Sequence, residues 1–234
     1  MSIKPIDCKK HRIFSENLRI LYEDNHVIAV YKPGGVLVQG DITGDISLMD
    51  IVKQYIKDRY KKPGNVFLGL VHRLDRPVSG VVVLAKTSKG ASRLSEQFRF
   101  RHITKIYLAQ VYGHMTPKEG TLSSYLRRET KGARLAGESE PGAQSAVLSY
   151  KVLKSMAGKS LLEITLHTGR KHQIRAQLAS QGHPIVGDVK YGAPSALSDN
   201  TIRLLAKSLS FKHPTKDEII TVESPDPDWD CGIS

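Results

Sequence analysis

Asp75 is a candidate nucleophile, within the stretch His72-Arg73-Leu74-Asp75. The apolar run before it predicts a strand over residues 67–74, and DRPVSG predicts a turn, so the carboxylate would stand at a strand end. Nearby cations favour the charged form of a carboxylate, which can attack a sugar or an electron-poor ring. Taken alone, the segment is more typical of a surface aspartate paired with a neighbouring arginine.

A second cluster covers residues 167–175, where five of nine residues are Arg, Lys or His. We expect a helix over residues 169–180, whose start would offer backbone N–H groups and cations together, as suits an RNA backbone. His167 and His172 are five residues apart, which misses the i, i+4 spacing of helical zinc sites, and no cysteine lies near them. No metal or other cofactor is expected.

A third candidate is Tyr107, in the predicted strand segment Lys105-Ile106-Tyr107. A tyrosine in such a place usually packs in the core with its hydroxyl at the rim. In an RNA-modifying enzyme it could instead stack on an extruded base. The segment by itself does not separate these two interpretations.

The charge distribution favours a polyanionic partner. The 234 residues carry a formal net charge of +12, but residues 217–230 hold six acidic residues and no Lys or Arg. The preceding 216 residues therefore hold 35 basic and 17 acidic residues. Such a surplus attracts nucleic acid by counterion release. A basic soluble protein without a nucleic-acid partner is compatible with the charge alone.

Several protein classes are disfavoured. No apolar run approaches the ~20 residues that cross a bilayer, and the first residues lack the apolar core of a secretory signal. Cys8 and Cys231 lie near opposite ends, so a disulfide framework is not expected. The sequence has no Asp-Phe-Gly and no Gly-x-Gly-x-x-Gly, which excludes a protein kinase. We expect a cytoplasmic monomer.

The predicted elements favour an α+β fold, with a mixed, largely antiparallel sheet, flanking helices and a central cleft. Strands are expected over residues 26–33, 67–74, 81–84, 105–111, 146–153, 161–166, 209–211 and 219–222, and helices over 48–56, 88–99 and 169–180. Asp45 or Ser47 would cap the first helix. Residues 115–145 show little periodicity and are expected to form a long hairpin or a flexible insertion.

Taken together, the three clusters resemble one family, the RluA-like pseudouridine synthases. Five stretches carry the resemblance in the family's order: ILYEDNHVIAVYKPGGVLV, GLVHRLDRPVSGVVVLAKT, TKIYLAQVYG, LHTGRKHQIRAQLASQGHPIVGDVKYG and LSFKHP. The resemblance implies an isomerase that breaks the N1–C1′ bond of a uridine, turns the uracil and rejoins it through C5. It also implies ribosomal or transfer RNA as the partner and no cofactor.

The resemblance also implies roles for individual residues. Asp75 would be the nucleophile, Tyr107 would stack on the flipped uracil and help remove the C5 proton, and Arg175 would hold Asp75 charged. Arg73 would lie beside the flipped nucleotide. The remaining expected substrate-binding residues are His72, Arg170, Lys171, His172, and Leu204 or Leu205 behind the pocket.

The domain organisation follows from the extent of the match. Residues 1–20 are expected to be an N-terminal extension and residues 21–234 the catalytic domain, which ends in an acidic segment over 217–234. Unlike many family members, the chain is expected to lack a separate N-terminal RNA-binding domain. It also departs from the family's usual Thr-Ser-Gly and Leu-His-Ala, with Val78-Ser79-Gly80 and Leu204-Leu205-Ala206.

Two other functions stay open. A glycoside hydrolase also attacks C1′ with a carboxylate, but it normally needs a second carboxylate as acid or base, and nothing marks Glu163 or Asp188 for that part. A catalytically inactive RNA-binding protein of the same fold is the other alternative. The joint presence of Asp75, Tyr107 and Arg175 disfavours it.

Overall fold

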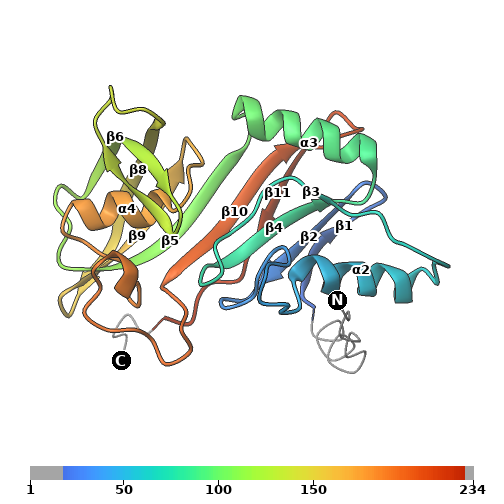
Figure 1. Ribbon diagram of the computed structural model, residues 1–234, viewed down its shortest axis with the longest axis horizontal. Coiled ribbons are helices and arrows are strands. Elements are labelled where there is room, and N and C mark those ends of the chain that lie inside the picture. Colours follow the sequence, from blue (N-terminus) through green and yellow to red (C-terminus); the bar gives the residue numbers. More distant parts are fainter. Residues whose placement is uncertain (1–17, 230–234) are drawn as a thin grey trace.

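A computed structural model of the protein describes residues 18–229 (Figure 1). Most of the expected N-terminal extension, both cysteines (Cys8 and Cys231) and Asp230 lie outside the described residues. No helix among the described residues combines the length and the apolarity that crossing a bilayer requires.

One mixed sheet runs through the molecule. Its strands are β1 (Ile20–Glu23), β2 (Val27–Lys32), β3 (Gly69–Leu70), β4 (Ser79–Ala85), β5 (Thr104–Tyr112), β6 (Glu119–Glu129), β7 (Gly132–Ala136), β8 (Ala143–Met156), β9 (Lys159–Leu166), β10 (Leu204–Lys212) and β11 (Ile219–Glu223). The order is β1-β2-β4-β10-β5-β9-β8-β6-β7, with β3 on β4 and β11 on β10. β4 and β10 pair in parallel, and the other strand pairs of the described chain are antiparallel. The predicted α+β fold is confirmed.

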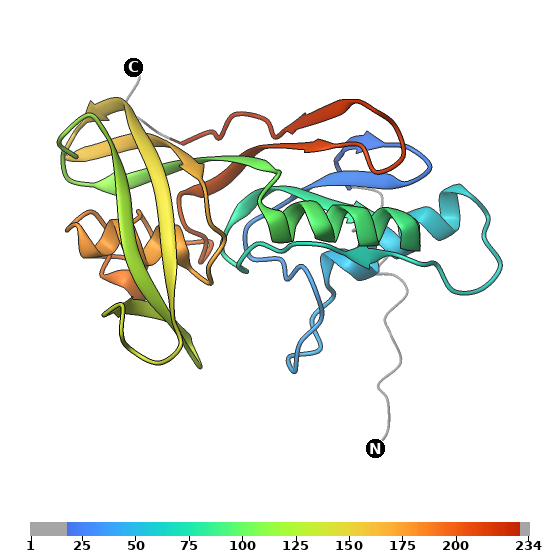
Figure 2. The ribbon, with the colours of Figure 1, turned by 90° about the horizontal axis from the view of Figure 1, so that it is seen from above.

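The sheet is divided into two lobes on either side of β10 (Figures 1 and 2). The first lobe holds β1 to β4 with the helices α2 (Leu48–Arg59) and α3 (Ser88–Phe100), and the second holds β5 to β9 with α4 (Gln173–Ser180). At its start β10 pairs with β4 at two positions, Leu205 with Ser79 and Ala206 with Gly80, and from Ser208 onward it pairs with β11. The sheet therefore opens between the lobes.

The first lobe buries both faces of its strands. Ile28 and Val30 of β2 pack in the larger core, which α2 covers, while Val27 and Ala29 pack in a second core, which α3 covers through Leu94. Because successive strand residues point to opposite faces, a continuous apolar run is needed when helices cover both. This explains the uninterrupted run in β2.

The helix boundaries follow local capping chemistry. Ser47, one of the two predicted caps, accepts from the backbone N–H of Asp50, whose carboxylate accepts in return from the N–H of Ser47. This reciprocal capping box satisfies two donors that a helix start leaves free. The hydroxyl of Thr87 caps α3 by accepting from the backbone N–H of Gly90, without a reciprocal bond, and α3 ends at Arg101 in the left-handed conformation.

Residues 115–145 consist largely of paired strands in the second lobe. β6 pairs with β8 on one side and with β7 on the other, and the turn between β6 and β7 lies at the end of this hairpin. Glu140 contacts both Arg127 and Arg134 there. Two cations of this segment are therefore already paired with a carboxylate.

We expect Gly80→Ala to destabilise the fold strongly. A Cβ at Gly80 would lie 2.3 Å from the carbonyl oxygen of Ala206, at a φ of +122°. Strain and overpacking each cost on the order of 1–3 kcal/mol, so the free energy of unfolding in urea should fall by at least about 2 kcal/mol. Gly137→Ala is the control, since nothing lies within 4 Å of its added Cβ. Equal stability of the two variants would contradict the tight β4–β10 contact.

Candidate active site

A cavity of about 580 Å³ lies between the two lobes. Its walls come from the loop at residues 37–41, the loop around Asp75, Tyr107 of β5, residues 169–175 and Leu204 of β10. Leu126, Arg128 and Ala133 of the β6–β7 hairpin close one side. The volume suits a ligand of nucleotide size.

The loop that carries Asp75 differs from the prediction. A strand was expected over residues 67–74, but β3 ends at Leu70 and residues 71–75 have no regular structure. The physical reason is that the backbone N–H of Val83, which a longer β3 would use, donates instead to Nε2 of His72 at 2.9 Å. Asp75 therefore stands in a loop and its side chain is 29% exposed.

His72 was expected to bind substrate, but its side chain is not part of the cavity wall. Its ring stacks on Phe98 of α3, with ring centroids 4.7 Å apart. Burial, helped by the charge of Lys105, lowers the pKa of His72 to about 3, so the ring stays neutral and accepts from Val83. The geometry gives His72 the role of fixing the loop before Asp75.

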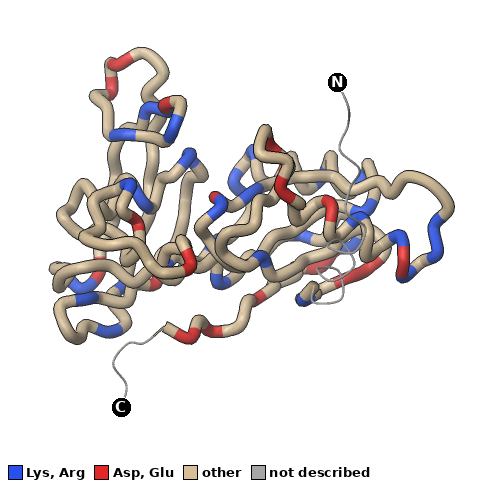
Figure 3. Tube along the Cα trace, turned by 60° about the horizontal axis from the view of Figure 1, so that its bottom comes forward, with Lys and Arg blue, Asp and Glu red and all other residues tan. Residues whose placement is uncertain are grey.

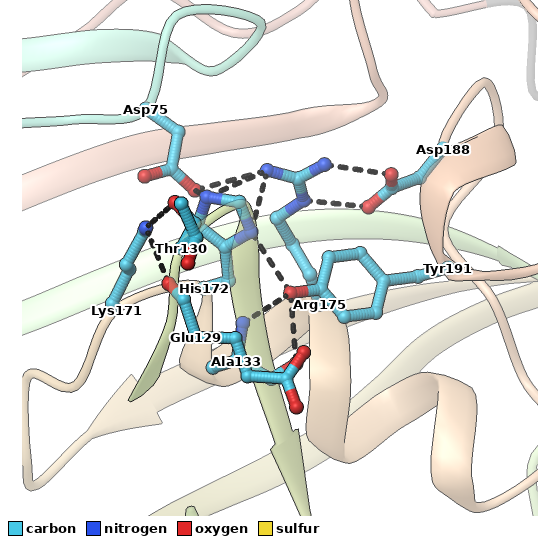
Figure 4. A network of polar contacts seen from close by, with 9 residues as sticks. All are labelled: Asp75, Glu129, Thr130, Ala133, Lys171, His172, Arg175, Asp188 and Tyr191. Carbon is cyan, nitrogen blue, oxygen red and sulfur yellow. Dashed lines mark hydrogen bonds and ion pairs between the residues drawn. The ribbon is translucent and has the colours of Figure 1, made fainter. Parts of the chain in front are cut away.

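Arg175 joins the two lobes through carboxylates on both sides (Figure 4). Its Nη1 lies 3.1 Å from Oδ2 of Asp75, across the cleft. Its Nε and Nη2 donate to the two carboxylate oxygens of Asp188 at 2.7 and 2.8 Å. Arg175 and Asp188 are almost fully buried, with side chains 6% and 1% exposed. The two-pronged contact with Asp188 fixes the plane of the guanidinium and so the donor that faces Asp75.

His172 and Tyr191 complete this network (Figure 4). His172 has a left-handed backbone conformation directly before α4, with its Nε2 3.5 Å from Asp75 and its Nδ1 2.9 Å from the hydroxyl of Tyr191. Burial lowers the pKa of His172 to about 4 against the opposing influence of Asp75. The ring is therefore neutral at pH 7, and Arg175 is the charged partner of Asp75.

Tyr191 ties the β6–β7 hairpin to the same group. It belongs to the short 3₁₀ helix η1 (Val189–Tyr191), and its hydroxyl bonds both the N–H and the carbonyl of Ala133 in β7, at 3.1 Å each. The guanidinium of Arg175 lies 4.9 Å from the centre of its ring. Lys171 adds contacts to the carbonyls of Glu129 and Thr130 at the hairpin turn.

Helix α4 begins later than predicted for a local reason. The helix was expected over residues 169–180 but begins at Gln173. Oε1 of Gln173 accepts from the backbone N–H of Arg170 and from the hydroxyl of Thr168, which holds residues 168–172 as a loop. Because of this loop, the side chains at 170–172 line the cavity instead of following one another around a helix.

A buried lysine supports the loop from the other side. Lys32 is fully buried at the end of β2, and its ammonium donates to the carbonyls of Pro33, Val36 and Arg76 at 2.8–3.1 Å. Burial lowers its pKa to about 7, while the charge of Asp75 acts in the opposite direction. Lys32 thereby connects the loop after β2 to the residue that follows Asp75.

Tyr107 lies in β5, as predicted, and lines the cavity. Burial and the charge of Asp75 raise its pKa far above the usual value, so the phenol keeps its proton. Its hydroxyl has no hydrogen-bond partner within residues 18–229, which leaves the ring and the hydroxyl available to a ligand.

The other expected site residues divide into two groups. Arg73, Arg170, Lys171 and Leu204 line the cavity, whereas Leu205 does not. Leu204 and Leu205 are adjacent in β10 and point to opposite faces, and the face of Leu204 belongs to the core beneath the cavity. Leu204 is therefore the apolar side chain behind the pocket.

Three residues of the network were not predicted as site residues. Asp188 lies in the sequence GDVKYG with no sign that it binds Arg175, and the same stretch contains Tyr191. Lys32 is fully buried, and the only sign of this in the sequence is its position at the end of the apolar run VIAVYK.

No group of three or more His, Cys, Asp or Glu that could hold a metal ion occurs within the described part of the chain.

Comparison with known proteins agrees with this geometry. Residues 26–180 match the family model of RNA pseudouridylate synthase. This chain belongs to that family. The uncharacterized RNA pseudouridine synthase YhcT of Bacillus subtilis is 37% identical over 90% of this chain and 69% of its own length. Ribosomal large subunit pseudouridine synthase D of Neisseria meningitidis serogroup A is 33% identical over 90% of this chain and 59% of its length.

A solved structure in this family has a similar fold. The human protein RNA pseudouridylate synthase domain containing 4 superposes with a TM-score of 0.80 and 26% identity, over 94% of both chains. The two bacterial relatives named above are longer than this chain, which spans 69% and 59% of their lengths.

We expect Asp188→Ala to destabilise this family member by about 3–5 kcal/mol, because the buried charge of Arg175 loses its two-pronged partner. Urea unfolding measures the effect. Glu163→Ala, which removes an exposed carboxylate from the same lobe, is the matched control and should stay near wild type. If both variants unfold alike, Asp188 does not hold Arg175.

His72 should make stability fall below neutral pH. Its folded pKa of about 3 lies below the usual value near 6.5, so its contribution is fully present above pH 6.5 and is lost as pH falls toward 3. Between pH 7 and pH 5 this loss amounts to up to about 2 kcal/mol. His72→Gln, which can still accept from Val83, should show a smaller loss in urea unfolding at the two pH values. An unchanged pH dependence would contradict a buried neutral His72.

Proposed function

We propose that the protein converts a uridine in structured ribosomal or transfer RNA to pseudouridine, with Asp75 as nucleophile. The observation that carries the proposal is a carboxylate held by Arg175 at the wall of a nucleotide-sized cavity, beside the ring of Tyr107. Arg175 fixes the position of this carboxylate, and a carboxylate held in place can act as a covalent nucleophile.

The proposed reaction is balanced without a co-reactant. A carboxylate oxygen of Asp75 attacks C1′ while the N1–C1′ bond breaks, and uracil leaves with the bonding electron pair on its ring. After the ring turns, C5 attacks C1′ and releases the carboxylate. C5 then loses its proton and N1 gains one, so the product is an isomer of the substrate.

Tyr107 supports a flipped uracil in this proposal. An aromatic ring at the cavity wall offers a stacking surface to a base that has left its helix, and such stacking is usual in RNA recognition. Because its phenol keeps its proton, Tyr107 can hand the C5 proton on only if it gives up its own at the same time. We assign it stacking first and proton transfer second.

The surrounding cations suit an RNA substrate. Arg73 is exposed at the cavity, and Arg170 and Lys171 lie at its rim. Lys and Arg residues are spread over both lobes, whereas the chain leading to the C-terminus is acidic (Figure 3). The relative from Neisseria is named for the large ribosomal subunit, which makes ribosomal RNA the first substrate to test. We infer a cytoplasmic monomer as the acting form.

Glycoside hydrolysis is disfavoured, because the second carboxylate of the cavity wall, Asp41, does not suit the role of the acid. Hydrolysis would need an acid whose pKa is raised, but hydrogen bonds from Thr43 lower the pKa of Asp41. Asp188 is bound by Arg175, and Glu163 lies outside the cavity wall. Hydrolysis would also change the RNA mass, which isomerisation leaves unchanged.

The test is Asp75→Asn with RNA from cells that lack this protein. We expect pseudouridine formation to fall by at least about 10³-fold, because an amide cannot attack C1′. RNA affinity should stay within about tenfold. Site-resolved pseudouridine mapping measures the first quantity and fluorescence anisotropy the second. Asp58→Asn, an exposed position on α2, is the matched control.

Turnover of Asp75→Asn near the wild-type rate would overturn the nucleophile assignment. A wild-type protein that binds RNA but converts no uridine in any cellular RNA would instead support an inactive RNA-binding protein. Release of free uracil would support hydrolysis.

A further inference from the structure

Three cations lie together outside the Asp75 network. Arg101 ends α3, Lys105 belongs to β5, and Arg170 lies in the loop before α4. Burial and then the charge of Arg101 lower the pKa of both Lys105 and Arg170. A Cβ placed on Gly169 would lie 3.5 Å from Nζ of Lys105. Two segments that are distant in sequence, residues 101–105 and the loop at Arg170, therefore bring positive charges to one place.

This group, which we call the basic cluster, has no internal anion. Within residues 18–229, none of its three members forms an ion pair with Asp or Glu, and the side chain of Arg170 donates only to the carbonyl of Ser145. Arg127 and Arg134 of the β6–β7 hairpin differ, because both contact Glu140. Like charges held close together disfavour one another, so an external anion would be bound strongly here.

The cluster is continuous with the cavity. Gly169 and Arg170 belong to the cavity wall. Lys105 and Tyr107 are two residues apart in β5, so they point to the same face at a spacing of about 7 Å. An anion bound at Lys105 would therefore lie about 7 Å along β5 from the position of Tyr107.

An exposed aromatic residue borders the cluster. Phe100 is 54% exposed, and the guanidinium of Arg99 lies 4.9 Å from the centre of its ring. The ring of His102 stacks nearby, with centroids 6.2 Å apart. Proteins that bind single-stranded nucleic acid combine cations for the backbone with exposed rings for the bases. Because the cluster is continuous with the cavity wall through Gly169 and Arg170, RNA is favoured over a membrane or an acidic protein as the ligand.

We propose that Arg101, Lys105 and Arg170 bind backbone phosphates of the single-stranded nucleotides that flank the target uridine, and that Phe100 stacks on a base of this flank. The inference rests on the proposed function, because it takes RNA as the ligand of the cavity. It adds a second binding surface where the end of α3, the start of β5 and the loop before α4 meet.

The experiment measures RNA binding by the full chain. Fluorescence anisotropy is recorded with a labelled stem-loop RNA of about 20 nucleotides carrying a uridine-rich loop, from 50 to 300 mM KCl. We expect Arg101→Gln with Lys105→Met to weaken binding by about 10- to 100-fold at 100 mM KCl. The slope of log Kd against log salt should fall by about 1–2, because each lost phosphate contact releases about one counterion fewer. Phe100→Ala should weaken binding by about tenfold.

The control pair is Arg59→Gln with Lys53→Met, which removes the same charges from exposed positions on α2, over the other core. It should change affinity by less than about twofold. Arg101→Lys with Lys105→Arg keeps the charges and should restore most of the affinity and the salt slope. Melting curves establish that each variant is folded.

Wild-type affinity and salt slope in the Arg101→Gln, Lys105→Met variant would overturn the inference, and so would an equal loss in the control pair. Either result would leave pseudouridine formation by the wild type untouched. Conversely, a wild type that converts no uridine while the cluster variants lose binding would refute the proposed function and retain the phosphate surface.

Discussion

The guanidinium of Arg175 is the interaction on which the rest of the site depends. It is buried between Asp188 of its own lobe and Asp75 of the other, so a single side chain bridges the lobes at the cleft. Burying a cation is costly unless carboxylates compensate for the lost water. Asp188 supplies two of the three carboxylate contacts, while Asp75 stays partly exposed at the cavity.

The groups that position Arg175 and Asp75 are either uncharged or buried. Neutral His172 lies beside Asp75 without competing for it, and Tyr191 connects the network to β7. On the opposite side, Lys32 and His72 hold the two ends of the Asp75 loop through backbone groups. A carboxylate in a loop can then be held as firmly as one on a strand.

Two surfaces flank the cleft, and they differ in how their charges are compensated. On the β6–β7 hairpin, Arg127 and Arg134 contact Glu140, and Arg134 also contacts Glu129. Where α3 ends and β5 begins, Arg101 and Lys105 have no carboxylate partner among the described residues. A polyanion that crosses the cleft would therefore gain more at Arg101 and Lys105 than at these paired arginines, while the hairpin is linked to the site through Tyr191.

The sequence by itself determined the α+β fold, the capped start of α2, the family and the candidates Asp75, Tyr107 and Arg175, because periodicity, capping residues and short motifs are local. It failed where a side chain replaced a backbone partner: His72 ends β3, and Gln173 delays α4. Only the tertiary structure decided that Asp188 holds Arg175, that Leu204 and not Leu205 faces the cavity, and that Arg101, Lys105 and Arg170 meet. These depend on distances between segments far apart in the chain, which no local pattern encodes.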